Sequence, residues 1–170
     1  MRLLFITLFL CSSLSAESGL LDIQWPKPNA KHQKPSTPYP AVLTNSIKEV
    51  KLPVYLPNSY AYNKNMIVVA DNNFYTVSFT LQGADIMISG DKTYQESVSP
   101  TNPEFKAIMK ASPPVEFMQS EGIMSAEFNR HGVNYSMAVE CEKPKTDKRC
   151  TETTFIKELY NQLIMVGGRP

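Results

Sequence analysis

The sequence predicts an α+β fold, a two-layer domain with about six antiparallel strands and two helices on one face of the sheet. Three observations support this prediction. Apolar and polar residues alternate with a period of two over several short segments, as in strands with one buried face. A segment near the C-terminus carries an apolar stripe of helical period instead. The 170 residues include 42% apolar and 19% charged residues, a composition typical of globular domains.

Residues 1–16 have the three parts of a cleavable signal peptide. A positive charge precedes an apolar run from Leu3 to Leu10, and small residues follow up to Ala16. The apolar run is much shorter than the roughly 20 residues that span a bilayer, so we expect no transmembrane anchor after processing. Lipid attachment at Cys11 stays open as an alternative, although Leu10 is larger than the residue that normally precedes a lipidated cysteine.

Residues 17–47 are predicted to form an extended, Pro-rich and basic tether. The segment has no apolar periodicity and no acidic residue between Asp22 and Glu49, which favours a polyproline-like conformation. It carries Trp25, the only tryptophan, and Tyr39. Because an aromatic side chain on a stiff segment is suited to anchor a partner, both are candidate partner contacts. The alternative is that Trp25 folds back onto the domain.

The folded domain is expected to span residues 48–170. Apolar residues alternate over residues 50–56, which predicts a strand with one buried face. Pro53 lies within this strand and has no amide hydrogen to donate to a neighbouring strand. We therefore expect residues 50–56 at an edge of the sheet.

Residues 66–71, 74–81 and 84–90 predict an antiparallel meander. Asn72-Asn73 and Gln82-Gly83 separate the three arms, and these residue types favour tight turns. Within residues 74–81 the apolar side chains share one face, and the serine and threonine side chains share the other. One face of the meander is therefore expected to contact water.

Two helices and a second hairpin complete the predicted fold. Asn102-Pro103 is a favourable helix start, and Pro113-Pro114 ends that helix. Residues 123–128 and 133–141 predict the hairpin. A final helix is expected from about residue 152 to Gly167, because its apolar side chains form a wide stripe.

Two cysteines, Cys141 and Cys150, remain after removal of the signal. An even number of cysteines in an exported chain predicts a disulfide. The bond would hold the last helix against the apolar face of the sheet, where the stripe of that helix needs to lie. A zinc site is the alternative, but it needs about four ligands, and His32 and His131 are the only histidines.

The sequence contains little that points to catalysis. We expect both His32, in the tether, and His131, in a turn, to be solvated, and we find no motif for a cofactor or a metal. Hydrolysis by a pair of carboxylates is the catalytic alternative, with residues 89–94 as a possible substrate loop. We expect the acidic residues to be scattered over the surface, with Asp85 facing solvent. The acidic candidates for such a pair are Asp85, Asp91, Glu96, Glu121 and Glu127.

The segment between the two cysteines is a second candidate for partner contact. Four basic residues stand there against two acidic ones, so the loop could dock on an anionic envelope component or an acidic protein surface. Without Arg2 the chain has 16 basic and 16 acidic residues. This balance argues against a nucleic-acid partner. The basic residues are Lys143, Lys145, Lys148 and Arg149.

These features predict an exported protein, periplasmic or secreted, that is not an enzyme and needs no cofactor. The expected function is that of an envelope binding protein or an accessory of an assembly, with a protein or envelope partner. A secreted inhibitor or effector-like factor is the first alternative, with the disulfide-bounded loop as its contact surface. A carboxylate-based hydrolase is the second.

Overall fold

The computed structural model describes residues 17–26, 37–96, 103 and 114–170, and in these ranges the chain is an α+β protein. The strands are β1 (Glu17–Leu20), β2 (Val54–Pro57), β3 (Ile67–Asp71), β4 (Phe74–Leu81), β5 (Ala84–Asp91), β6 (Thr93–Glu96), β7 (Glu116–Ser120), β8 (Ile123–Arg130), β9 (Val133–Cys141) and β10 (Leu163–Gly167). The helices are α1 (Ala41–Ser46), α3 (Lys148–Thr151) and α4 (Thr154–Asn161).

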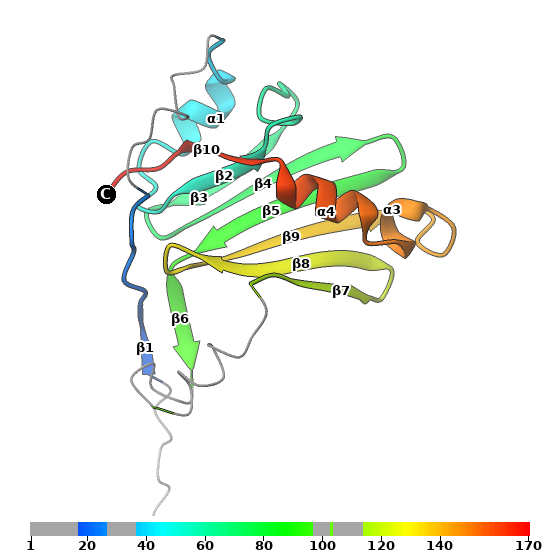
Figure 1. The fold of residues 1–170 in the computed structure, drawn as a ribbon. Coiled ribbons are helices and arrows are strands. Elements are labelled where there is room, and N and C mark those ends of the chain that lie inside the picture. Colours follow the sequence, from blue (N-terminus) through cyan, green and yellow to red (C-terminus); the bar gives the residue numbers. More distant parts are fainter. Residues whose placement is uncertain (1–16, 27–36, 97–102, 104–113) are drawn as a thin grey trace, which may run out of the picture.

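Six strands form one antiparallel sheet in the order β3-β4-β5-β9-β8-β7 (Figure 1). Two meanders, β3-β4-β5 and β7-β8-β9, meet where β5 pairs with β9. Two further pairs, β1 with β6 and β2 with β10, form separate two-stranded sheets. The predicted fold class is confirmed, and so are both predicted hairpin systems.

The inner face of the six-stranded sheet is the core of the protein. Side chains at alternate positions are fully buried there, including Tyr75, Phe79 and Met137. Gly90 lies on the same face, where the rings of Tyr75 and Tyr135 leave no room for a side chain. A Cβ added at Gly90 would lie 2.6 Å from the Tyr75 ring and 2.7 Å from the Tyr135 ring. The apolar alternation therefore predicted the buried face of the sheet.

Helix α4 and the pair β2-β10 lie across this inner face (Figure 1). All four residues of β2 are buried, and two tyrosines of the sheet hold it in place. The Tyr75 hydroxyl accepts from Tyr55 N at 3.0 Å and donates to Tyr55 O at 3.1 Å, while Tyr135 donates to Pro53 O at 2.8 Å. A strand at a sheet edge does form at Val54–Pro57, but its sheet is the pair β2-β10 and not the six-stranded sheet, whose edges are β3 and β7. The prediction of a single buried face was wrong.

The last helix is shorter than predicted. It ends at Asn161, and the amide of Gln162 closes it on carbonyls of its final turn. Leu163–Gly167 forms β10 and pairs with β2. A continuous apolar run fits a helix stripe and a buried strand equally well. Here the segment forms a strand because its backbone pairs with the backbone of β2.

Parts of the predicted tether belong to the folded domain. Residues 41–46 form α1, and Leu43 and Ile47 are buried in the core, so the start of the domain at residue 48 was wrong. Glu17–Leu20 pairs with β6. Residues 1–16, 27–36 and the predicted helix after Asn102, apart from Pro103, lie outside the described residues. Within the described residues, no helix combines the length and the hydrophobicity needed to cross a membrane.

Candidate functional site on the open face of the sheet

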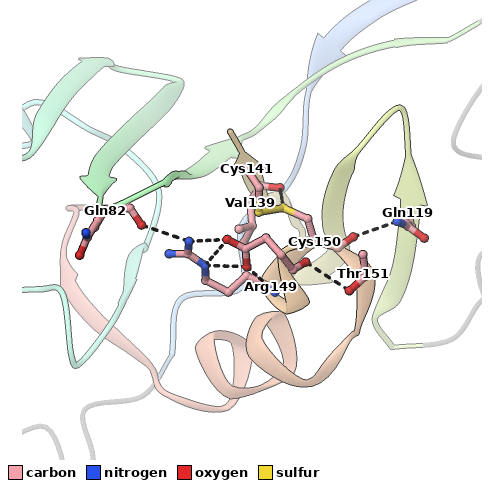
Figure 2. The surroundings of a disulfide bond; sticks show 8 residues. Gln82, Gln119, Val139, Cys141, Arg149, Cys150 and Thr151 are labelled. Carbon is pink, nitrogen blue, oxygen red and sulfur yellow. Dashed lines mark hydrogen bonds and ion pairs between the residues drawn. A yellow bond between two sulfur atoms is a disulfide. The ribbon is translucent and has the colours of Figure 1, made fainter. Parts of the chain in front are cut away.

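The predicted disulfide is present. Cys141, at the end of β9, bonds to Cys150 in α3, with 6.3 Å between the Cα atoms (Figure 2). Both residues are buried. Gln119 of β7 donates to Cys150 O at 2.9 Å, so the same point also ties an edge strand to the helices. The bond connects α3 to the sheet, as the parity of Cys141 predicted.

The basic loop between the cysteines exposes three lysines but not its arginine, and one of these lysines, Lys148, lies 3.8 Å from the Glu152 carboxylate. Lys143, Lys145 and Lys148 are exposed. The Arg149 guanidinium instead bonds to the Asp147 carboxylate and to Gln82 O in the β4-β5 turn (Figure 2). The hydrogen bonds from Arg149 hold the pKa of Asp147 at about 2, so this contact stays charged in any ordinary buffer.

Trp25 and Tyr39 are both half-buried, and Tyr39 packs against the core. The backbone on either side of Ile23 is fixed, because Leu21 N donates to Lys92 O at 2.6 Å and Gln24 N donates to His131 O at 2.9 Å. The Tyr39 ring lies 5.1 Å from the ring of Tyr62. Contact of Trp25 or Tyr39 with a partner stays a prediction.

His131 lies in the β8-β9 turn, as predicted, but it is not fully solvated. Its ring stacks on Tyr55 at 6.2 Å, and burial together with Arg130 lowers its pKa. The Arg130 guanidinium lies over three rings, with the nearest centroid, that of Tyr55, at 5.0 Å. These contacts close one end of the core. No His, Cys, Asp or Glu cluster suited to a metal ion occurs in the part of the chain that the structure describes.

The outer face of the six-stranded sheet is the most unusual surface of the described residues. Side chains at outward positions of the strands are exposed or half-buried, so no described element covers this face. Five of the eight exposed large apolar residues project from it. They are Ile67 at 65% exposure, Val69 at 57%, Met87 at 47%, Phe74 at 38% and Met118 at 37%.

The strand register arranges part of these side chains as an apolar band. One cross-strand row runs the full width of the sheet and contains four apolar side chains and two serines. Neighbours in such a row have Cβ atoms about 4.5–5.5 Å apart, so their side chains touch or nearly touch. In order from β3 to β7, the row is Ile67, Ser78, Met87, Ala138, Ser125 and Met118.

Carboxylates flank this band, and no lysine or arginine occupies an outward position of the six strands. Asp85 of β5 lies directly opposite Glu140 of β9, and Glu116 of β7 lies directly opposite Glu127 of β8. None of the ion pairs in the described residues includes any of these four. Like charges in opposite positions destabilise a sheet. Two further outward acids, Asp71 and Asp91, accept hydrogen bonds from the adjoining turns.

A depression of about 360 Å³ lies where the apolar band meets the first acidic pair. Asp85 and Glu140 line it together with Met87, Ala138 and Ile123. Ile123 lies opposite Glu140 in the register, so an apolar side chain lies next to the two carboxylates. This site combines negative charge with apolar surface.

Sequence reasoning named one acid of each pair, Asp85 and Glu127, but not the opposite residues Glu140 and Glu116. Asp85 faces solvent as predicted, but it shares one face with Asp91 and Glu127. Glu121 lies in the β7-β8 turn, and only the backbone of Glu96 is described. The missing signal was the pairing of β5 with β9, which joins segments about fifty residues apart and brings Glu140 to Asp85.

Comparison with known proteins adds no identity. No protein-family model, no curated protein and no solved structure matches this chain.

Proposed function

We propose that this chain is an exported, non-enzymatic binding or assembly-accessory protein of the cell envelope, and that it holds its partner on the outer face of the sheet. The observation that carries the proposal is a sheet face on which exposed apolar side chains form a band between acidic pairs. Export accords with the predicted signal in residues 1–16 and with the disulfide, since disulfides persist in oxidising compartments.

The apolar band supports a contact surface because exposed apolar side chains gather there. Isolated exposed apolar residues are common and need no explanation, whereas a contiguous patch with a polar rim is typical of an interaction site. Ile67, Met87 and Met118 belong to one row, and Val69 projects from the same edge strand as Ile67. Binding would remove this surface from water at a gain of about 25 cal/mol for each Å² buried.

The acidic pairs support the same conclusion from energetics. A sheet selected for stability alone would place opposite charges, or none, at Asp85 and Glu140 and at Glu116 and Glu127. Natural sequences break such local rules mainly at functional sites. The face therefore has the character of a surface maintained for a partner.

Hydrolysis by carboxylates is the second candidate, because Asp85 and Glu140 share one depression. Such hydrolases keep one carboxyl group protonated by burying it in apolar surroundings while the other stays ionised. Both Asp85 and Glu140 are exposed, so the two have similar surroundings. Binding is therefore the better-supported function.

Capture of partners from envelope extract tests the proposal. Met87→Lys places a bulky cation in the middle of the band, and Val42→Lys makes the same kind of change on α1, which is not part of the outer face of the six-stranded sheet. Both positions are exposed, so neither variant should lose stability. We expect Met87→Lys to reduce capture at least tenfold and Val42→Lys to leave it unchanged.

Two further variants separate the rival surfaces. If Trp25→Ala abolishes capture while Met87→Lys does not, the contact lies on the N-terminal segment and the proposal is wrong. A triple variant replaces Lys143, Lys145 and Lys148 with serine. The proposal is also wrong if Met87→Lys reduces capture no more than this triple variant does.

A further inference from the structure

We infer that the partner segment that binds the outer face carries both positively charged and apolar side chains. A lysine or arginine side chain of this segment enters the depression between Asp85 and Glu140. The inference rests on the proposed function. It names the chemistry of the occupant, which the proposed function leaves open.

The geometry of the depression suits a long cationic side chain. Asp85, Glu140 and Ile123 are consecutive in one cross-strand row, and Met87 and Ala138 are adjacent in the next row. The aliphatic stem of a lysine or arginine packs on apolar surface while its charged end stays near polar groups. Met87 and Ile123 offer that surface, and the two carboxylates offer acceptors for charge-assisted hydrogen bonds.

Charge complementarity determines the class of partner. The outward positions of the six strands hold six carboxylates and no lysine or arginine, so a phosphate-rich surface would be repelled. A neutral apolar segment would bury Asp85 and Glu140 without compensation, which is costly. A cationic group placed between Asp85 and Glu140 would instead relieve the repulsion that the folded sheet already contains.

The described part of the chain does not supply this cation itself. Arg149 lies next to the β4-β5 turn, and this turn comes shortly before Asp85 in the sequence. The Arg149 guanidinium, however, bonds to Asp147 and to Gln82 O. Asp85 and Glu140 take part in none of the ion pairs of the described residues. Within the described residues, Asp85 and Glu140 are therefore open to a cation from a partner.

A protein segment fits better than a small polyamine, because the apolar band extends beyond the depression. Met87 borders the depression, but Met118 on β7 and Val69 on β3 project from strands at the two edges of the sheet. A small cation would leave these side chains exposed. A chain that crosses the strands covers them and places its cations against the acidic pairs.

A synthetic peptide that repeats two lysines and two valines is a suitable probe of this chemistry, because in an extended chain each of its faces then carries both kinds of side chain. The full mature chain, labelled at the methyl groups of methionine and isoleucine, would be titrated with the peptide and followed by NMR. We expect saturable shifts of the Met87 and Ile123 methyl signals, and weaker binding as the salt concentration rises. The same peptide with glutamate in place of lysine should not bind.

Matched charge variants test the depression itself. Asp85→Asn with Glu140→Gln removes two negative charges from the depression, and Glu152→Gln with Glu158→Gln removes two from the exposed surface of the helices. We expect the first double variant to bind the lysine–valine peptide about tenfold more weakly. The second should bind it as the unmodified chain does.

Each contrary result has a definite meaning. If both double variants weaken binding of the peptide equally, only the net charge of the chain matters. The depression between Asp85 and Glu140 is then not the binding site. Spermidine that binds as tightly as the peptide and shifts the same methyl signals would overturn the protein segment as occupant. If capture from extract depends on Met87 but not on Asp85 and Glu140, the proposed function stands and this inference fails.

Discussion

The two faces of the six-stranded sheet are built from alternate residues of the same strands, yet they follow different rules. On the inner face, residues such as Ile86 and Ile88 are buried under α4 and β2. On the outer face, the intervening residues Asp85 and Met87 are exposed, with a like charge opposite the first and an apolar band around the second. The inner face packs apolar side chains into the core, whereas the outer face exposes apolar side chains and pairs like charges.

The contrast indicates that the two faces answer to different requirements. A face that only had to contact water would carry mixed charges, which stabilise a sheet through opposite cross-strand pairs. The outer face keeps Glu116 opposite Glu127, and it exposes Met118, the last residue of the apolar band, in the next row. Stability accounts for the inner face, and the proposed binding function would account for the outer one.

The largest expected effect separates two neighbouring residues of β5. Ile88→Ala removes a side chain that is 1% exposed, so we expect a loss of about 2–5 kcal/mol in the free energy of unfolding. Met87→Ala truncates a side chain that is 47% exposed and should change stability by no more than about 0.5 kcal/mol. Urea denaturation of both variants measures the difference. A comparable loss for Met87→Ala would mean that the outer face is covered and that the comparison fails.

The disulfide gives the next largest effect, because it fastens α3 to the end of β9. Replacing both Cys141 and Cys150 with alanine should reduce the free energy of unfolding by roughly 2.5–3 kcal/mol, the loop entropy of a ten-residue closure. Reduction of the unmodified chain under denaturing and refolding conditions should give the same loss. If native protein without reductant shows two reactive thiols, the bond is absent in solution.

Two tyrosines that hold β2 on the inner face should differ in their contributions. Tyr75→Phe leaves both Tyr55 N and Tyr55 O without their partner, and we expect a loss of about 1–3 kcal/mol. Tyr135→Phe leaves only Pro53 O. A carbonyl without its partner is tolerated better than a buried amide, so its loss should be the smaller in thermal unfolding. The reverse order would show that β2 depends mainly on the bond from Tyr135.

Most of the sheet was predictable because local patterns encode it. The alternation in residues 74–81 and 133–141 identified the strands and their buried faces, and the parity of Cys141 predicted the link to the C-terminal helices. These features depend on short stretches of sequence and on elementary strand geometry. No tertiary information was needed for them.

The errors occurred where a distant partner decides the conformation. Leu163–Gly167 continues the helical stripe in sequence, but pairing with β2 makes it a strand. Residues 41–47 have little local signal, yet Leu43 and Ile47 are buried. The acidic pairs of the outer face have the same origin, because Glu140 meets Asp85 only through the pairing of β5 with β9.

The smallest expected effect is also the most direct test of what the outer face is for. Glu127→Gln removes the repulsion between Glu127 and Glu116, so we expect the free energy of unfolding to rise by about 0.2–1 kcal/mol. Glu121→Gln, in the turn of the same hairpin, serves as the control and should have no effect. Asp85→Asn should likewise stabilise the sheet by relieving Glu140. If stability rises in these variants while binding of the lysine–valine peptide falls, the carboxylates reduce the stability of the sheet in favour of binding, as is common at functional sites. If stability falls instead, the charges are compensated within the chain, and the acidic pairs no longer favour a cationic partner.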